Sequence, residues 1–402
     1  MNFLARRPCD PGISFGLKGH VSSLSRAGFH GLTHSVSTPS FKKRHCTRTL
    51  SRGKICSCGL QMEPLLNMSP GSIGLLVLLA YSFKKLVDFV RAACDLHLLG
   101  KRDPPKEYFS DSVVWVVGAS QGIGKALAER WAATGARVIL SSRNKESLDS
   151  LKRMLVSTYG IQDAHVAVLP MDITESFKVV ETTAHHAYQH FGRLDYVVYN
   201  VGASQHAPVE ETSHEVAEKL LGMNFLGQVA LARAVQPVFL EQGHGHHVVI
   251  ASMASVVPSP GQAVYSATKS ALRSYFLSMA SELDSRGIHV SVICPGPVDV
   301  GDSTGPRKVY GRDGIIEQKN TAKSRARVDV DECTRLVLRA VYNKVDECWI
   351  SKHPVLLMGY LFQLLPRVGM KLLKKIGPGR VRQFDTGTGT GYDVLKMLDG
   401  KH

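Results

Sequence analysis

Tyr265 and Lys269 are four residues apart in the sequence Tyr-Ser-Ala-Thr-Lys, at the start of a stretch with helical spacing. This spacing places both side chains on one face of a helix. A phenol with a pKa of about 10 is a poor acid or base at neutral pH, but a neighbouring ammonium favours the phenolate. Ser252 ends the preceding predicted strand, where its hydroxyl can bind a carbonyl oxygen. The three residues predict proton transfer to or from a carbonyl or an alcohol.

Asn224 lies in the middle of the helix that is predicted before the same strand. Asparagine has a poor helix propensity, and in mid-helix it commonly faces solvent or bonds to the backbone where it kinks the helix. Asn224, Ser252, Tyr265 and Lys269 together are more informative than any one of them. We therefore expect these four to form the catalytic set, with Ser252 and Tyr265 contacting the substrate.

A glycine-rich turn follows the first predicted strand and reads Val-Gly-Ala-Ser-Gln-Gly-Ile-Gly. Glycine permits a tight turn and a close approach of the backbone to a pyrophosphate, and the next helix offers unpaired N–H groups to the anion. Because the turn lies between an apolar strand and a helix, it predicts dinucleotide binding. The residues expected to hold the dinucleotide here are Gly118, Ser120, Gln121, Gly122, Ile123 and Gly124.

The end of the second predicted strand reads Ser-Ser-Arg-Asn and contains no acid. An acid at this position would accept hydrogen bonds from the ribose hydroxyls of NAD, whereas a cation would pair with the 2′-phosphate of NADP. Arg143 can form a forked ion pair with that phosphate, and Ser142 is an additional donor. The sequence therefore favours NADP(H) as the cofactor.

These residues lie at the ends of apolar strands that alternate with helices. The expected strands cover 113–117, 137–141, 164–170, 196–199, 248–251, 290–294 and 348–350. The expected helices cover 122–134, 145–159, 175–190, 215–240 and 264–286. Such alternation predicts an α/β fold with a Rossmann-type doubly wound parallel sheet, forming a single catalytic domain over residues 112–351.

The motifs together resemble the short-chain dehydrogenase/reductase family over about residues 112–350. The resemblance rests on the glycine turn, the Met-Asp-Ile-Thr segment at Asp172, the Tyr-Asn-Val-Gly segment from Tyr199 and the Pro-Gly-Pro-Val segment from Pro295, together with the four catalytic candidates. It implies an NADP-linked enzyme with Tyr265 as proton donor and acceptor. It further implies that Ser252 polarises the carbonyl, that Lys269 holds the nicotinamide ribose, and that Asn224 anchors a water that relays protons to Lys269.

The resemblance also implies further cofactor contacts. Asp172 and Ile173 would flank the adenine, and Asn200 and Gly202 the adenosine side. Pro295, Gly296 and Val298 would border the nicotinamide. Two residues depart from the family pattern, because Val117 replaces a threonine that braces the turn and Tyr199 replaces an asparagine. These changes keep a second reading open, a non-catalytic NADP(H)-binding scaffold at a membrane.

The chain carries a formal charge of +15, but ten of its 49 Lys and Arg residues and only one acid lie in residues 1–61. The basic excess therefore belongs mostly to one terminal segment, so we expect no nucleic-acid partner. The eight cysteines are too scattered for a metal site or a disulfide framework. Histidines cluster around His186 and His246, but no acid or cysteine has suitable spacing, so we expect no metal.

The N-terminal part divides into three segments. Residues 1–61 are expected to be disordered, either as a transit peptide or as sequence upstream of the true start. Residues 62–84 contain an uncharged apolar stretch from Leu65 to Phe83, of a length that just spans a hydrocarbon core, and are predicted to be a signal anchor. Residues 85–111 are expected to be an amphipathic linker. The protein would then lie in the endoplasmic reticulum membrane, or in mitochondria if the first segment is a transit peptide.

The C-terminal part continues with an apolar segment at 352–377 and an expected flexible tail at 378–402. The apolar segment either packs on the catalytic domain or lies on a membrane. Residues 300–327 are expected to form a substrate lid. An apolar segment beside such a lid suggests a lipophilic carbonyl or alcohol, such as a steroid, retinoid or quinone. The family resemblance implies a homodimer or tetramer through the two long helices.

Overall fold

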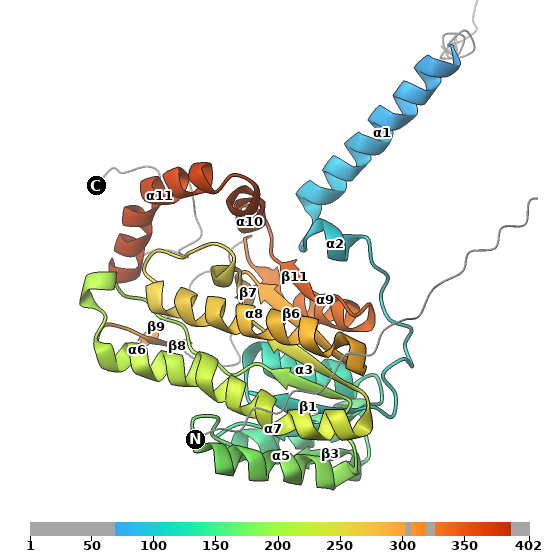
Figure 1. Cartoon of the computed structure of the whole chain (residues 1–402), viewed down its shortest axis with the longest axis vertical. Coiled ribbons are helices and arrows are strands. Elements are labelled where there is room, and N and C mark those ends of the chain that lie inside the picture. The colour runs from blue at the N-terminus through green and yellow to red at the C-terminus, as the bar shows by residue number, and fades with distance from the viewer. Residues whose placement is uncertain (1–68, 302–306, 319–325, 387–402) are drawn as a thin grey trace, which may run out of the picture. The chain divides into compact units, whose positions relative to one another are not determined.

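The computed structural model describes residues 69–301, 307–318 and 326–386, and its centre is a seven-stranded parallel sheet (Figure 1). The strand order is β11-β6-β5-β4-β1-β2-β3. The strands are β1 (Val113–Val117), β2 (Arg137–Ser141), β3 (Val166–Val168), β4 (Tyr196–Tyr199), β5 (Gly245–Ile250), β6 (Ile288–Pro295) and β11 (Glu347–Ile350). The order reverses direction between β1 and β4, the point where open α/β sheets bind ligands.

Helices cover both faces of the sheet, as the alternating sequence predicts. They are α3 (Gly122–Ala132), α4 (Lys145–Tyr159), α5 (Phe177–Phe191), α6 (His214–Leu221), α7 (Gly227–Gln242), α8 (Ala263–Leu283) and α9 (Val330–Tyr342). The short parallel pair β7 (Val298–Asp299) and β10 (Val328–Asp329) lies beyond β6 in the chain. The antiparallel hairpin β8–β9 (Arg307–Tyr310 and Ile315–Gln318) lies within the expected lid, of which 302–306 and 319–325 are outside the described residues.

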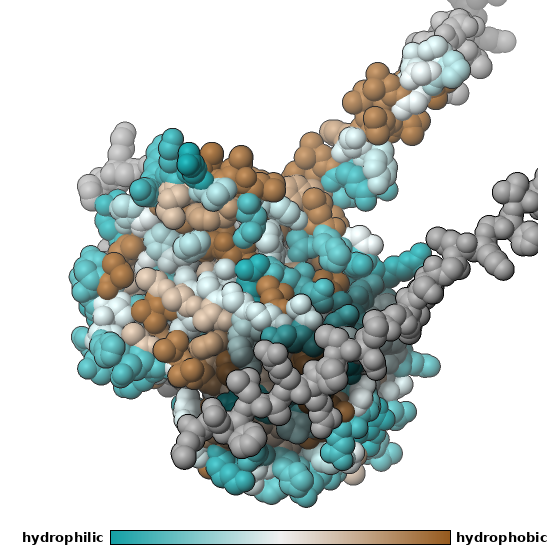
Figure 2. Space-filling model, viewed as in Figure 1, coloured by the Kyte–Doolittle hydropathy of each residue, from teal (hydrophilic) through white to brown (hydrophobic). Residues whose placement is uncertain are grey.

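Four further helices of the described chain flank the catalytic domain in the sequence. They are α1 (Pro70–Arg91), the short α2 (Leu96–Leu99), and the pair α10 (Val355–Leu364) and α11 (Pro366–Thr386). Helix α1 has no buried residue, and Figure 2 shows apolar residues along it and over α10. Within the described ranges, no helix is both long enough and apolar enough to cross a membrane. The first residues of the predicted anchor, 62–68, lie outside those ranges.

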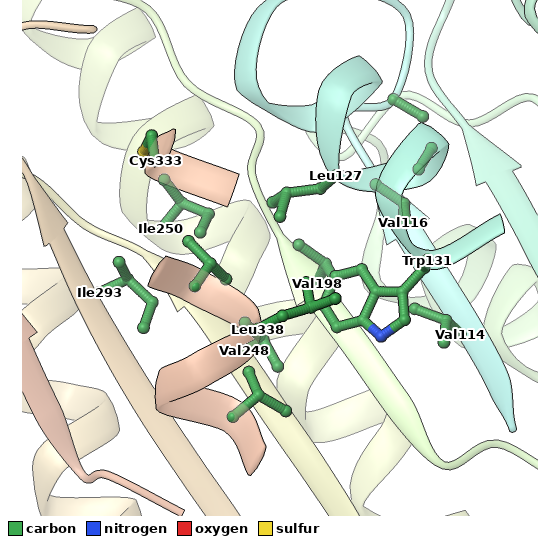
Figure 3. Packing of buried hydrophobic residues seen from close by; sticks show 14 of the residues in the cluster. Val114, Val116, Leu127, Trp131, Val198, Val248, Ile250, Ile293, Cys333 and Leu338 are labelled. Atoms are coloured by element: carbon green, nitrogen blue, oxygen red, sulfur yellow. The ribbon is translucent and has the colours of Figure 1, made fainter. Parts of the chain in front are cut away.

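Alternate residues of β1 enter two separate hydrophobic cores, because successive strand side chains point to opposite faces. Val114 and Val116 pack with Leu127 and Trp131 of α3 and with Leu338 of α9, as Figure 3 shows. The other core combines the opposite face of β1 with α5, α7 and α8. All five residues of β1 are buried, which explains why the strand is apolar throughout rather than alternating.

Most predicted elements are confirmed, with three differences. The helix expected over 215–240 is interrupted by a π-helical turn at Gly222–Leu226. The expected linker contributes Cys94, Leu98 and Phe109 to the core, so it is packed rather than free. The expected tail begins later than residue 378, because α11 continues to Thr386. Phe384 of this helix stacks on His206, and Arg380 donates to Gln262 just before α8.

Candidate active site

The turn after β1 is built for a very close approach of backbone to backbone. Gly118 has a φ of +94°, a conformation that favours glycine. A Cβ on Gly124 would lie 2.1 Å from the carbonyl oxygen of Gly118, so no side chain fits there. The Asn200 side chain donates to the same oxygen at 2.9 Å, and the backbone N–H of Gly118 donates to the carbonyl of Ser141 at 2.8 Å. The ends of β2 and β4 therefore fix the turn.

Helix α3 begins directly after this turn and is not capped by the side chain before it. Gln121 holds the N-cap position in an extended conformation, and its side chain makes no capping hydrogen bond. The first N–H groups of a helix have no intrahelical partner and carry partial positive charge. A tight glycine turn that leads into an uncapped helix start fits the pyrophosphate of a dinucleotide, and these residues could hold one.

The residues expected around the adenosine lie together at the ends of β2 and β3. The backbone N–H of Met171 donates to the carbonyl of Ser142 at 3.0 Å, which joins the two strand ends. Arg143 comes within 4.0 Å of the Asp172 carboxylate, but its side chain is 70% exposed. Asp172 accepts hydrogen bonds from the Thr174 backbone and hydroxyl at 2.9 and 2.7 Å. Arg143 is thus accessible to an anion beside this strand end.

A cavity of about 440 Å³ lies next to the glycine turn, between α3 and α4. Its lining includes Ser120 from the turn, Lys125 from α3, and Glu146 and Ser150 from α4. The cavity thus adjoins the expected cofactor cleft. Among the described residues that line it, Ser120 is the only one that the sequence predicted as a site residue.

Lys269 reaches from α8 to the end of β5 and is almost completely buried. Its Nζ donates to the carbonyl oxygen of Ile250 at 2.9 Å. Ile250 is the last residue of β5, two positions before Ser252, so this hydrogen bond brings the lysine to the strand end that carries the serine. Tyr265 lies one helical turn before Lys269. The structure therefore brings the predicted Ser, Tyr and Lys to one edge of the sheet.

Burial changes the acid–base behaviour of Lys269. Desolvation lowers the pKa of its ammonium to about 8, a shift that the nearby Cys294 partly opposes. Removing an ammonium from water disfavours its charged form, which accounts for the direction of the shift. Lys269 is consequently a cation at neutral pH that releases its proton more easily than an exposed lysine.

Asn224 lies in the π-helical turn between α6 and α7 and is fully buried. Its Oδ1 accepts from the backbone N–H of Ala203 at 2.8 Å, and its Nδ2 donates to the carbonyl of Ala203 at 3.0 Å and to the hydroxyl of Thr268 at 3.1 Å. The alternative of a backbone-bonded, helix-distorting asparagine is confirmed, and the solvent-facing alternative is wrong. A Cβ on Gly202 would lie 3.2 Å from Asn224 Oδ1 and 3.3 Å from Lys269 Nζ, so Gly202 separates the two side chains.

The expected nicotinamide border is a tight corner at the end of β6. A Cβ on Gly296 would lie 2.1 Å from the Ser351 hydroxyl, so only glycine fits there. Pro295 ends β6, and Val298 begins β7 and is buried. A Cβ on Gly122 at the start of α3 would meet Val300 at 3.8 Å. The corner after β6 therefore faces the glycine turn, as a dinucleotide that spans the two would require.

Tyr199, which departs from the family pattern, and two histidines of β5 are buried in the sheet. Tyr199 is fully buried, and its hydroxyl lies 2.7 Å from Nδ1 of His247 inside the sheet, so it serves packing rather than the site. Burial lowers the pKa of His246 and of His247 to about 3, which keeps both imidazoles neutral. No group of three or more metal-ligating side chains occurs in the part of the chain that the structure describes.

Gln205 was missed by the sequence reasoning. It lies three residues beyond Gly202, is fully buried, and bonds to the start of α8. A single polar residue in a loop has no periodic or motif signal, so only its place in the fold reveals it.

A glycine turn that leads into an uncapped helix, together with a Ser, Tyr and Lys set at the same edge of a parallel sheet, defines a dinucleotide-type oxidoreductase. Residues 112–308 match the family model for short chain dehydrogenases, and the chain belongs to the short-chain dehydrogenase/reductase family as an oxidoreductase. It is 34% identical to Dehydrogenase/reductase SDR family member 7 of Homo sapiens over 79% of this chain and 94% of that protein.

The chain is also similar to other relatives, and its fold is similar to solved structures. The chain is 29% identical to Dehydrogenase/reductase SDR family member 7B of Mus musculus over 69% of this chain and 85% of that protein. A short-chain dehydrogenase structure from Streptomyces avermitilis has 25% identity and a TM-score of 0.54, covering 67% of this chain and 99% of the other. An alcohol dehydrogenase from Thermococcus sibiricus, complexed with 5-hydroxy-NADP, has 23% identity and a TM-score of 0.51, covering 60% and 97%.

Proposed function

We propose that the protein is an NADP(H)-dependent oxidoreductase that interconverts a carbonyl and an alcohol on a lipophilic substrate. The observation that carries this proposal is the buried Lys269, which lies one helical turn after Tyr265 and is held on the carbonyl of Ile250, two residues before Ser252. Burying an ammonium costs free energy unless it is compensated, so its presence here points to a functional requirement.

When bound, the reduced nicotinamide supplies a hydride to the carbonyl carbon. The Ser252 hydroxyl donates a hydrogen bond to the carbonyl oxygen and orients it, and Tyr265 donates the proton that completes the alcohol. The Lys269 cation favours the tyrosinate that remains and binds the ribose hydroxyls. Asn224 holds the backbone of Ala203 in place. From the family resemblance we infer that it also anchors a water that relays protons to Lys269.

The choice of NADP(H) rests on the strand end at Arg143. The guanidinium is largely exposed and lies at the predicted ribose position, and the following residues contain no acid until Glu146. A forked cation matches the geometry of a phosphate dianion. We infer that Arg143, with Ser142, binds the 2′-phosphate.

The lipophilic substrate and the membrane location rest on apolar surface at both ends of the described chain. Leu75, Val77, Leu78 and Phe83 of α1 are all exposed. Exposed residues where α10 meets α11 are Leu364, Leu365, Val368 and Met370. Apolar residues beside exposed cations such as Lys371 suit an interface with anionic lipid. We infer anchoring in the endoplasmic reticulum membrane, with mitochondria as the alternative, and a homodimer through α7 and α8.

Membrane attachment is tested by expressing the full chain in cells and extracting the microsomes with alkaline carbonate. The protein is expected to stay with the membrane pellet, together with an endoplasmic reticulum marker. Release into the supernatant, or fractionation with mitochondria, would contradict the anchor or the compartment respectively.

The catalytic proposal is tested with detergent-solubilised full chain, NADPH and a panel of lipophilic ketones, aldehydes and quinones. NADPH oxidation by the natural protein is expected with at least one carbonyl, and Tyr265→Phe and Ser252→Ala should remove most of it. The NADPH dissociation constant is measured for all three proteins. Tight NADPH binding without turnover of any substrate would instead favour the non-catalytic scaffold.

A further inference from the structure

The four residues Ser204–Ala207 connect two parts of the site that are far apart in the sequence. On one side, the backbone N–H of Tyr310 in the hairpin β8–β9 donates to the carbonyl of Ser204, and the N–H of His206 donates to the carbonyl of Tyr310, both at 2.8 Å. On the other side, the N–H of Ala207 donates to the carbonyl of Gly261 at 3.0 Å, just before α8. This connector therefore lies between the hairpin and the helix that carries Tyr265.

Gln205 is the residue of this connector whose side chain reaches the helix. Its amide oxygen accepts from the backbone N–H of Val264 at 3.0 Å and from that of Tyr265 at 3.2 Å. Its amide nitrogen donates to the hydroxyl of Thr212 at 2.7 Å, and that hydroxyl donates to the carbonyl of Pro208. Both ends of the amide are bonded and the residue is fully buried, so its orientation is fixed.

Helix α8 needs such an acceptor from outside. The first N–H groups of a helix have no intrahelical acceptor and are normally satisfied by the N-cap side chain or by water. At the N-cap position of α8, Gln262 makes no capping hydrogen bond. Its amide instead donates to Ser204 Oγ at 2.8 Å and accepts from Ser259 and Arg380. Gln205 therefore supplies the capping acceptor for α8 in place of the N-cap residue Gln262.

We propose that Gln205 is a positioning residue, which caps α8 from the neighbouring loop and thereby fixes Tyr265 relative to the hairpin β8–β9. The inference rests on the proposed function, in which Tyr265 transfers the proton. One of the two N–H groups that Gln205 binds belongs to Tyr265 itself, so a loss of the cap would let the first turn of the helix fray at the catalytic residue. Small displacements of a reacting group cost a large part of its effectiveness.

The hairpin β8–β9 is also connected to the start of α8 by side-chain packing. Tyr310 is buried with Val216 and Leu220 of α6, and Val264 packs against this cluster. Gln205 and Tyr310 form a backbone bridge, so a movement of the hairpin is transmitted to the residue that caps the catalytic helix.

The cap is tested first without reference to turnover, by hydrogen exchange of the backbone amides of Val264 and Tyr265 in the full-length protein. Both should be protected in the natural chain, although amides at these helix positions usually exchange fast. Gln205→Leu and Thr212→Val should accelerate their exchange, and Gln205→Glu, which keeps an oxygen in place, should preserve protection. Fast exchange in the natural protein, or no change in Thr212→Val and Gln205→Leu, would overturn the inference.

Kinetics then test the positioning role with the substrate found for the natural protein. Gln205→Leu is expected to lower kcat by about tenfold or more while the NADPH dissociation constant stays within about twofold, and Gln205→Glu should recover most of kcat. If Gln205→Leu does not fold, Thr212→Val takes its place in the test, and it is expected to lower kcat by a smaller factor with little change in the NADPH dissociation constant. A natural kcat in Gln205→Leu, or in Thr212→Val where Gln205→Leu does not fold, would contradict the proposal.

A matched control is Gln242→Leu. The Gln242 amide binds both the N–H and the carbonyl of Leu194 at the opposite edge of the sheet, at 2.9 and 2.7 Å. Its loss should lower stability without changing kcat or the exchange of Val264 and Tyr265. If the natural protein binds NADPH but reduces no carbonyl, the proposed function fails, whereas the exchange experiment still decides whether Gln205 caps α8.

Discussion

Lys269 illustrates how a single residue links stability to chemistry. Its side chain is buried between α8 and the end of β5, and among the described residues its Nζ donates one hydrogen bond, to the carbonyl of Ile250. A buried ammonium with so little compensation is unfavourable for folding. The protein retains it at the position where a cation next to Tyr265 is useful, which is the pattern expected when function overrides stability.

The burial of Lys269 predicts a pH dependence of stability. The unfolded chain keeps the lysine protonated up to its ordinary pKa of 10.5, whereas the folded protein releases the proton from about pH 8. The unfolded state therefore binds more protons within this window, and the contribution of Lys269 to the free energy of unfolding rises with pH, by up to about 3 kcal/mol.

The measurement is urea unfolding of the natural chain and of Lys269→Met from pH 7 to pH 10. The difference in unfolding free energy between the two proteins should be constant below about pH 8 and should then shift in favour of the natural chain. A difference that stays flat over the whole range would show that Lys269 is not desolvated.

Arg143 provides a second prediction for a single residue. Replacing it by leucine should weaken NADPH binding by about tenfold, the loss of one charge-assisted phosphate contact, and leave NADH binding unchanged. Arg153→Leu is the control, because Arg153 is also exposed and lies on the adjacent α4. Dissociation constants for NADPH and NADH are measured by fluorescence titration. An equal loss of affinity for both nucleotides in Arg143→Leu would exclude a 2′-phosphate contact.

The reactive residues could be found from the sequence because each has a fixed relation to a strand end or a helix turn. Ser252 follows a strand, and Tyr265 and Lys269 are one helical turn apart. For Asn224 the sequence left two alternatives open, a side chain that faces solvent and a side chain that bonds to the backbone. Gln205 could not be found at all, since its partners at Thr212 and Val264 are set by tertiary packing rather than by spacing.

At the scale of elements, the π-helical turn at Gly222–Leu226 explains how Asn224 can lie inside a helical region and still reach a loop. One extra residue in the helical turn changes the direction of the side chains that follow. The next residue, Gly227, packs so closely that a Cβ would lie 2.4 Å from the carbonyl oxygen of Ile173. The sequence indicated a single long helix here, because hydrophobic spacing does not reveal one inserted residue.

For the elements, the testable prediction concerns the glycine turn between β1 and α3. Gly124→Ala would place a methyl group 2.1 Å from the Gly118 carbonyl, so the turn must open. We expect the loss of NADPH binding and a destabilisation of about 2 kcal/mol, typical of a forced backbone shift. Gly222→Ala is the control, because its Cβ would meet nothing within 4 Å and its backbone is right-handed helical.

Thermal unfolding and NADPH titration of both variants test this expectation. Gly222→Ala should bind NADPH normally. Undiminished binding by Gly124→Ala would contradict the role of the turn as the pyrophosphate cradle.

At the scale of the whole molecule, the segment before the sheet is attached to the last strand. The buried carboxylate of Asp95 accepts from the backbone N–H of Leu98 at 2.8 Å and from that of Trp349 in β11. Burial raises the pKa of this carboxyl, and the two backbone donors oppose the shift. The residues expected as a linker thus become part of the domain, which the sequence could not show because the partner lies far away in the chain.

Asp95→Ala is therefore expected to destabilise the protein by about 2–4 kcal/mol at pH 7, because two backbone N–H groups lose their acceptor. Asp163→Ala is the matched control, since the Asp163 side chain is largely exposed in its ion pair with Lys152 and its loss should change stability by less than about 1 kcal/mol. Urea unfolding at constant pH compares the two, and equal effects would argue against the attachment of the segment to β11.

The central claim is that Tyr265 and Ser252 reduce a carbonyl with a hydride from NADPH. Its most direct test is NADPH that carries deuterium at the transferable position of C4, incubated with a reactive ketone and the full-length protein, followed by mass analysis of the alcohol. The account predicts deuterium on the carbinol carbon with the natural chain and almost none with Tyr265→Phe, although both bind NADPH. Unlabelled alcohol from the natural protein, or equal labelling by Tyr265→Phe, would contradict it.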